Sequence, residues 1–89
     1  MENLHVLLPL VNECSTPFRL RLEPIPEWFL LQPGQEVVVH GICNADTRNF
    51  AFTVAPYDLG LTLYAPGELA GWVDCFVTHN GVRLVPDGN

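Results

Sequence analysis

A chain of 89 residues is long enough for one domain, residues 1–89, with one hydrophobic core. Apolar residues make up 48% of the chain and charged residues 16%, a balance that excludes intrinsic disorder. Ten carboxylates against four arginines, with no lysine, give a net charge of −6. Because such a chain repels phosphate, we expect it to bind neither nucleic acid nor an anionic membrane surface.

The predicted elements begin with the apolar run Leu4–Val11, which we interpret as a strand buried on both faces. After a turn, residues 18–23 alternate apolar and charged side chains, the pattern of a strand with one face in the core. Further runs of this kind predict strands over residues 28–31, 36–43, 50–55, 61–64, 71–78 and 82–85. The sequence therefore predicts an all-β fold, a small antiparallel β-sandwich or flattened barrel of seven or eight short strands.

Proline, glycine and asparagine mark the turns between these strands. Pro33-Gly34 has the chemistry of a type II turn, and Asn80-Gly81 predicts a type I′ hairpin because both residues tolerate positive φ. A turn is expected over Pro56–Gly60 and a loop over Asn44–Asn49. The only helical candidate is a single turn around Glu68–Ala70.

The predicted hairpin divides the strand that precedes it into two faces. The core-facing set is expected to be Val73, Cys75 and Val77, with Val82 and Leu84 across the hairpin. The opposite set is expected to be Trp72, Asp74, Phe76 and Thr78. Because this second set mixes two aromatic side chains with a carboxylate, we expect it to form a half-covered surface.

Three cysteines, Cys14, Cys43 and Cys75, lie about thirty residues apart in this sequence. An odd number at such spacing does not match the disulfide framework of a small secreted domain, so all three are expected to be buried, reduced thiols. The N-terminal apolar run is too short for a membrane span and has no basic residues before it. We therefore expect a cytoplasmic protein.

Four segments carry a resemblance to known proteins. They are Leu22-Glu23-Pro24, the run from Leu31 to Val37 with its Pro-Gly turn, the aromatic strand around Tyr64, and the Asn80-Gly81 turn. In these segments, between about residues 17 and 85, the chain resembles a set of short, uncharacterised bacterial all-β proteins. It departs from them in Ile25-Pro26 and in its apolar N-terminal strand. The resemblance implies a β-sandwich and carries no activity.

The sequence offers no catalytic nucleophile. Ser15 is the only serine, and no Gly-x-Ser-x-Gly motif surrounds it. A cysteine nucleophile needs a histidine beside it, but His40 and Cys43 fall on opposite faces of one predicted strand. The absence of lysine excludes Schiff-base chemistry. We therefore predict no catalytic residue and no enzyme activity.

The sequence gathers neither metal ligands nor paired carboxylates. Small sandwiches include blue-copper proteins, which bunch histidine, cysteine and methionine ligands, but here Met1 is the only methionine. Cys75 and His79 lie on one strand face about 13 Å apart, too far for one ion. Glu68 and Asp74 are the acids nearest Trp72, without a cleft expected between them. We predict no cofactor and no metal.

The aromatic side chains are the remaining candidates for function. Trp72, Phe76, Trp28 and Tyr64 are the predicted binding residues, because aromatic rings on a sheet face anchor protein interfaces or stack sugars. High apolar content and low charge favour a non-enzymatic protein-interaction or self-associating module, with a homodimer or a protein partner. One alternative is a small-ligand or carbohydrate-binding module, and a more distant one is a cupredoxin-like metal-binding domain.

Overall fold

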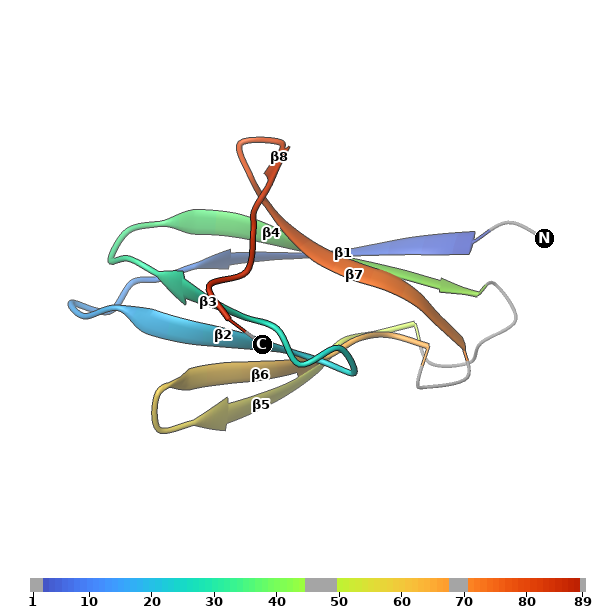
Figure 1. The fold of residues 1–89 in the computed structure, drawn as a ribbon, viewed down its shortest axis with the longest axis horizontal. Helices are drawn as coiled ribbons and strands as arrows, with labels where there is room; N and C mark the ends of the chain where they lie inside the picture. The colour runs from blue at the N-terminus through green and yellow to red at the C-terminus, as the bar shows by residue number, and fades with distance from the viewer. Residues whose placement is uncertain (1–2, 45–49, 68–70, 89) are drawn as a thin grey trace.

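A computed structural model describes residues 3–44, 50–67 and 71–88 of the chain. These residues form eight strands in two four-stranded sheets, so the all-β prediction is confirmed (Figure 1). The strands are β1 (Asn3–Val11), β2 (Phe18–Glu23), β3 (Trp28–Leu31), β4 (Glu36–Asn44), β5 (Thr53–Tyr57), β6 (Gly60–Tyr64), β7 (Trp72–His79) and β8 (Val82–Arg83). No helix in the described residues is long and apolar enough to cross a membrane. The helical turn expected at Glu68–Ala70 and residues 45–49 of the expected loop lie outside the described residues.

The two sheets differ in strand direction. The antiparallel sheet has the order β1-β4-β7-β8, and the mixed sheet has the order β3-β2-β6-β5. In the mixed sheet β2 pairs with β6 in parallel, from Arg19 opposite Gly60 to Glu23 opposite Tyr64. The expectation of a fully antiparallel fold is therefore wrong at this pair. The hairpin partner β3 occupies one side of β2, and β6 reaches the other side only after the chain has passed through the opposite sheet.

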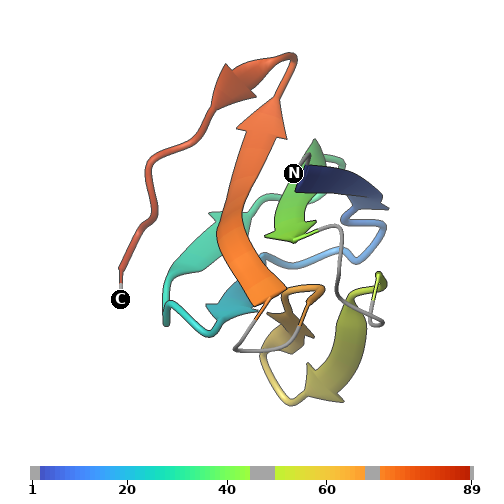
Figure 2. The same ribbon diagram turned by 90° about the vertical axis from the view of Figure 1, so that its right-hand side faces the viewer.

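Figure 2 shows the strands of the two sheets in a view turned by 90°. One hydrophobic core is built from residues of both sheets. Alternation along each strand sends every second side chain inward. On β4, for example, Val37 and Val39 are buried, whereas Val38 and His40, which alternate with them, are partly exposed. The mixed sheet contributes Leu20, Leu22, Phe29, Leu31 and Leu63, and the antiparallel sheet contributes Val37, Val39, Cys75 and Val77.

Three sequence expectations about strands are corrected by the structure. The strand expected at residues 82–85 ends at Arg83, and Val82, expected in the core, is 66% exposed. Leu4–Val11 is not buried on both faces: Val6 and Leu8 are partly buried on one face, whereas Leu7, on the opposite face, is 56% exposed. β1 pairs only with β4 and is an edge strand. The strand expected at residues 50–55 begins later, at Thr53, and runs through Pro56 to a two-residue turn before Gly60. A proline is tolerated there because β5 is also an edge strand and needs no ladder bond on its outer side.

Every sheet edge in the described part of the chain carries a feature that hinders further strand pairing. Pro9 lies within edge strand β1, and Pro56 lies within edge strand β5. Edge strand β8 has only two residues. The C-terminal segment covers the edge of β3, where the backbone N–H of Trp28 donates to the Gly88 carbonyl at 2.9 Å. Open edges promote aggregation, so these features favour contacts through sheet faces over contacts through edges.

The turns predicted at Pro33-Gly34 and Asn80-Gly81 are confirmed, whereas Pro56 and Tyr57 of the turn expected over Pro56–Gly60 belong to β5. At Pro33-Gly34, Gly34 has a φ of 81° and Gln35 N–H donates to the Gln32 carbonyl at 3.0 Å. At Asn80-Gly81 the φ angles are 51° and 79°, as a type I′ turn requires. In this hairpin His79 pairs with Val82 and Thr78 pairs with Arg83.

One buried polar residue, Asn12, ties two turns together. Its side-chain Nδ2 donates to the carbonyls of Thr16 at 3.1 Å and Leu31 at 3.0 Å, and its Oδ1 accepts from Cys14 N–H at 2.9 Å. Its backbone carbonyl accepts from Gly34 N–H at 2.7 Å. The residue is 3% exposed, so no bulk water replaces these partners. Asn12 thus holds the β1–β2 turn against the β3–β4 turn.

Candidate functional site

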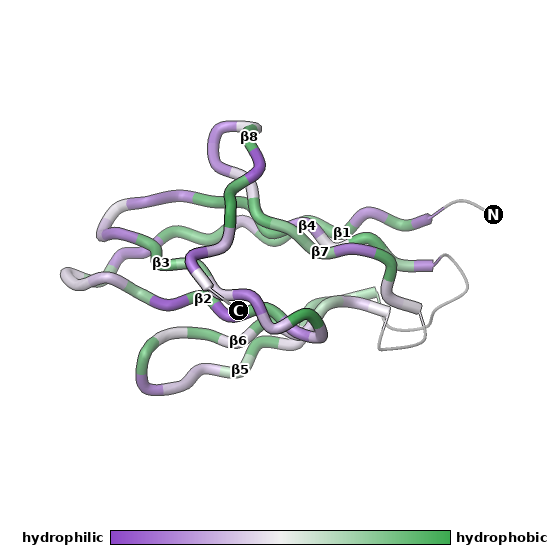
Figure 3. The backbone as a smooth tube through the Cα atoms, in the orientation of Figure 1, coloured by the Kyte–Doolittle hydropathy of each residue, from purple (hydrophilic) through white to green (hydrophobic). Residues whose placement is uncertain are grey.

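The outer face of the antiparallel sheet is the first candidate surface. It consists of His5, Leu7 and Pro9 on β1, Val38, His40 and Ile42 on β4, and Asp74, Phe76 and Thr78 on β7. Apolar residues follow both β1 and β4 along the tube in Figure 3. The central row joins Leu7, His40 and Phe76 across three strands. No ionised side chain lies in that row, so removing it from water carries only a small desolvation penalty.

Two histidines and a threonine form a hydrogen-bonded chain across this face. His5 Nε2 lies 2.9 Å from His40 Nδ1, and His40 Nε2 lies 2.8 Å from Thr78 Oγ1. The His40 ring stacks on Phe76, with centroids 4.6 Å apart and an interplanar angle of 7°. Burial, and next the charge of His5, lower the pKa of His40 below its usual value. The His40 imidazole is therefore neutral at pH 7 and fixed in orientation.

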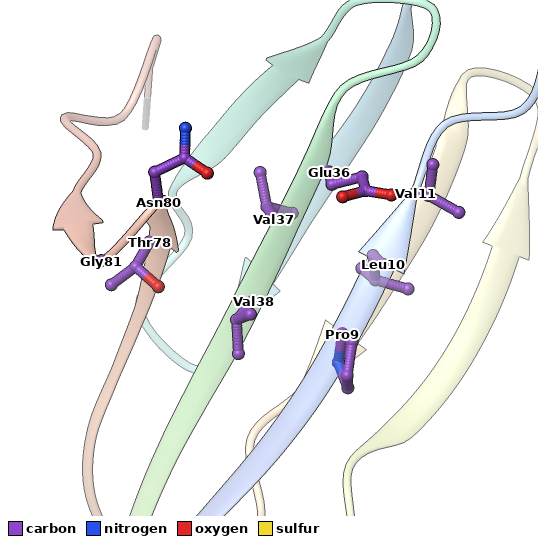
Figure 4. Close-up of a pocket in the computed structure, with 9 residues that line it drawn as sticks. All are labelled: Pro9, Leu10, Val11, Glu36, Val37, Val38, Thr78, Asn80 and Gly81. Atoms are coloured by element: carbon purple, nitrogen blue, oxygen red, sulfur yellow. The ribbon is translucent and has the colours of Figure 1, made fainter.

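Charges lie at the rim of this face. Arg83 stands over the Phe76 ring, with its Cζ 4.7 Å from the ring centroid, and its Nη1 lies 3.8 Å from Asp74 Oδ2. A hollow of about 440 Å³ continues from the face toward the β7–β8 turn. Its lining residues come from β1, β4 and the end of β7 with its turn (Figure 4). Glu36 is the only ionisable residue that lines it.

The outer face of the mixed sheet has a different chemistry. Arg19 stands over the Trp28 ring at 4.2 Å, and Arg21 stands over the Tyr57 ring at 4.8 Å. Tyr64 lies on the same face and is 47% exposed. A hollow of about 240 Å³ is lined by Arg19, Arg21, Leu22, Glu23, Pro26, Glu27 and Trp28. Charged and aromatic groups alternate here, so this face suits a polar ligand better than an apolar partner.

The structure does not bring the four predicted binding residues together. Phe76 lies on the outer face of the antiparallel sheet, as expected. Trp28 and Tyr64 lie on the outer face of the mixed sheet, on strands separated by β2. Trp72 packs against the hydrophobic core, and its Nε1 is buried without a hydrogen-bond partner among the described residues. The expectation that Trp72 shares a face with Phe76 is wrong.

A β-bulge explains why Trp72 turns inward. Asp74 pairs with Ile42 and Trp72 pairs with Cys43, so Val73 is an extra residue in β7. Such a bulge shifts the alternation of side chains by one position. Val73, expected in the core, is consequently 46% exposed. No local sequence pattern distinguishes this bulge from a regular strand.

The cysteines divide into one exposed and two buried thiols. Cys43 and Cys75 are buried, as expected, whereas Cys14 is exposed in the turn after β1, so the expectation of burial is wrong for Cys14. Burial, followed by the charges of Asp74 and Glu27, raises the pKa of Cys75 to about 12. At neutral pH Cys75 therefore carries almost no reactive thiolate.

We expect one fast-reacting thiol in the native protein. A chromogenic disulfide reagent at pH 8 should label Cys14 at once, because its thiol is exposed, and should label the two buried thiols only after denaturant is added. The fast phase should be absent from the Cys14→Ser variant. Fast labelling that persists in this variant would show that Cys43 or Cys75 is accessible.

Sequence reasoning missed the contact between His5 and His40. The two residues are 35 positions apart and meet only because β1 pairs with β4. The described residues contain no group of three or more histidine, cysteine or acidic side chains that could hold a metal ion. No protein-family model, no curated protein and no solved structure matches the chain.

Proposed function

We propose that this protein is a non-enzymatic module that self-associates into a homodimer through the outer face of the antiparallel sheet. The observation that carries this proposal is the 56% exposure of Leu7 on edge strand β1, at one end of the uncharged row that continues through His40 to Phe76. A monomer gains nothing from presenting such a side chain to water, whereas a second copy that covers it removes apolar area from water.

Symmetry favours a second copy as the partner. A two-fold axis through the centre of the face sets each apolar row against its own counterpart. Arg83 and Asp74 at the rim carry opposite charges, so Arg83 of one copy can pair with Asp74 of the other. The prolines in β1 and β5 hinder pairing at those edges, which leaves face-to-face packing as the route of association. A cytoplasmic location fits three free thiols.

A concentration series in sedimentation velocity tests this proposal. The wild type should shift from monomer to dimer with rising concentration, and Leu7→Asp should weaken the dimer about 30-fold or more because it buries a carboxylate at the interface. Leu59→Asp is the matched control, since Leu59 is equally exposed, at 58%, but lies in the β5–β6 turn. It should leave the dimerisation constant unchanged.

Two outcomes would contradict the dimer. One is a wild type that stays monomeric at every concentration, and the other is an equal effect of both leucine variants. Circular dichroism of each variant checks that the fold is retained. Because Leu7 and Leu59 are both more than half exposed, neither substitution should change the free energy of unfolding of the monomer by more than about 0.5 kcal/mol.

A second candidate is recognition of a small polar ligand or a sugar on the outer face of the mixed sheet. The hollow that Trp28 lines with Arg19, Arg21, Glu23 and Glu27 favours it, because donors and acceptors surround an aromatic ring. Against it, Arg19 already covers the Trp28 ring at 4.2 Å. Titration of tryptophan fluorescence with a sugar panel should show a change in the wild type that Trp28→Phe abolishes, if this candidate holds.

A further inference from the structure

The His5–His40 pair has the nitrogen–nitrogen distance of two ligands to one metal ion. Two nitrogens that each lie about 2.0–2.1 Å from an ion, at an angle of about 90–110°, are about 2.9–3.4 Å apart. His5 Nε2 and His40 Nδ1 are 2.9 Å apart, at the short end of that range. In the hydrogen bond the two nitrogens are directed at each other, so a rotation of the exposed His5 ring is needed to turn both lone pairs toward one ion beside the pair.

The surroundings of His40 orient it as metal ligands are usually oriented. Ligating histidines commonly donate their second ring N–H to an oxygen, which fixes the tautomer. His40 Nε2 has such a partner in Thr78 Oγ1 at 2.8 Å, and when Nε2 carries the proton the lone pair of Nδ1 points toward His5. The stacked Phe76 ring holds the imidazole in this position.

His5 supplies the second nitrogen without a rearrangement of the backbone. In the metal-free protein, His5 Nε2–H donates to His40 Nδ1 when His40 is protonated on Nε2. To bind an ion, His5 Nε2 gives up this proton and its exposed ring takes the other neutral tautomer, with a proton on Nδ1. No charge other than that of the ion enters the site.

We propose that His5 and His40 form a bidentate site for a divalent transition-metal ion, Ni²⁺, Cu²⁺ or Zn²⁺. Imidazole suits these ions, whereas Mg²⁺ and Ca²⁺ prefer oxygen. Since no group of three or more histidine, cysteine or acidic ligands gathers in the described residues, water completes the coordination sphere in the monomer, where no second copy covers this face. The site is distinct from Cys75 and from His79, whose Nδ1 lies 2.7 Å from the Glu36 carbonyl.

Calorimetric titration with Ni²⁺ at pH 7.5 tests the site. We expect saturable binding in a Cys14→Ser background, which removes the exposed thiol as a competing ligand. His5→Gln and His40→Gln should each weaken the Kd about tenfold or more, because each leaves a single imidazole. His79→Gln, which removes the third histidine of the chain, should leave the Kd within about twofold of the parent.

A measurement on the protein without histidine substitutions guards against variants that fail to fold. Ni²⁺ is paramagnetic and broadens the NMR signals of nearby nuclei. In heteronuclear NMR spectra of the histidine rings, it should broaden the signals of His5 and His40 before those of His79. Absence of heat and of broadening at a tenfold excess of Ni²⁺ would overturn the proposal. Loss of binding in His79→Gln equal to that in His40→Gln would overturn it as well.

Discussion

Replacing Trp72 with alanine should lower the free energy of unfolding by about 3 kcal/mol, the lower end of the range for a buried aromatic side chain. The indole packs against the core beside the β-bulge, and its Nε1 is buried. Truncation leaves a cavity between the sheets that the neighbouring strands fill only in part. Urea denaturation followed by circular dichroism measures the loss.

Two comparison variants separate a core role from an interface role. Trp72→Phe keeps a ring in the core and removes a buried N–H that has no partner in the described part of the chain, so it should cost less than about 1.5 kcal/mol. Phe76→Ala, on the outer face, should cost about 1–2 kcal/mol and should weaken self-association. If instead Trp72→Ala weakens the dimer and barely changes the free energy of unfolding, the indole belongs to the interface.

Replacing Asn12 with alanine should cost about 2–4 kcal/mol of unfolding free energy. The side chain makes three hydrogen bonds in a buried site, to Thr16, Leu31 and Cys14. Each net bond contributes about 0.5–1.5 kcal/mol, and partners left without a bond add a desolvation penalty. The same denaturation experiment measures the effect.

Asn12→Asp tests which of these bonds matter. The carboxylate can still accept from Cys14 N–H, but it cannot donate, and it faces the carbonyls of Thr16 and Leu31. We expect this variant to be at least as unstable as Asn12→Ala at pH 7. An aspartate variant close to wild type in stability would mean that the two donated bonds contribute little.

The strands could be predicted because their signals are local. Alternation along residues 18–23 and the Asn80-Gly81 turn depend only on neighbouring residues, and both are confirmed. Pairing between distant segments could not be predicted in this way. The parallel contact of β2 with β6 and the edge position of β1 depend on how the chain passes between the sheets.

The candidate surfaces were predictable only in part, for the same reason. Phe76 was placed on the correct face by alternation, whereas the bulge at Val73 shifted Trp72 by one position and into the core. The contact of His5 with His40 joins two strands, and no local sequence pattern predicts that these strands pair. In the sequence Asn12 is indistinguishable from other polar turn residues, because its contact with the β3–β4 turn forms only in the folded chain.

The covered edge of β3 has a consequence for the order in which the fold is completed. Leu30 N–H donates to Asp87 Oδ2 at 2.7 Å, a contact that spans 57 residues. β2 and β3 are neighbours in sequence and pair locally, whereas the cover over the outer side of β3 needs this long-range contact and is expected to form later. Until this contact forms, the backbone groups on the outer side of β3 are unpaired, so a folding intermediate without it can pair with a strand of another chain.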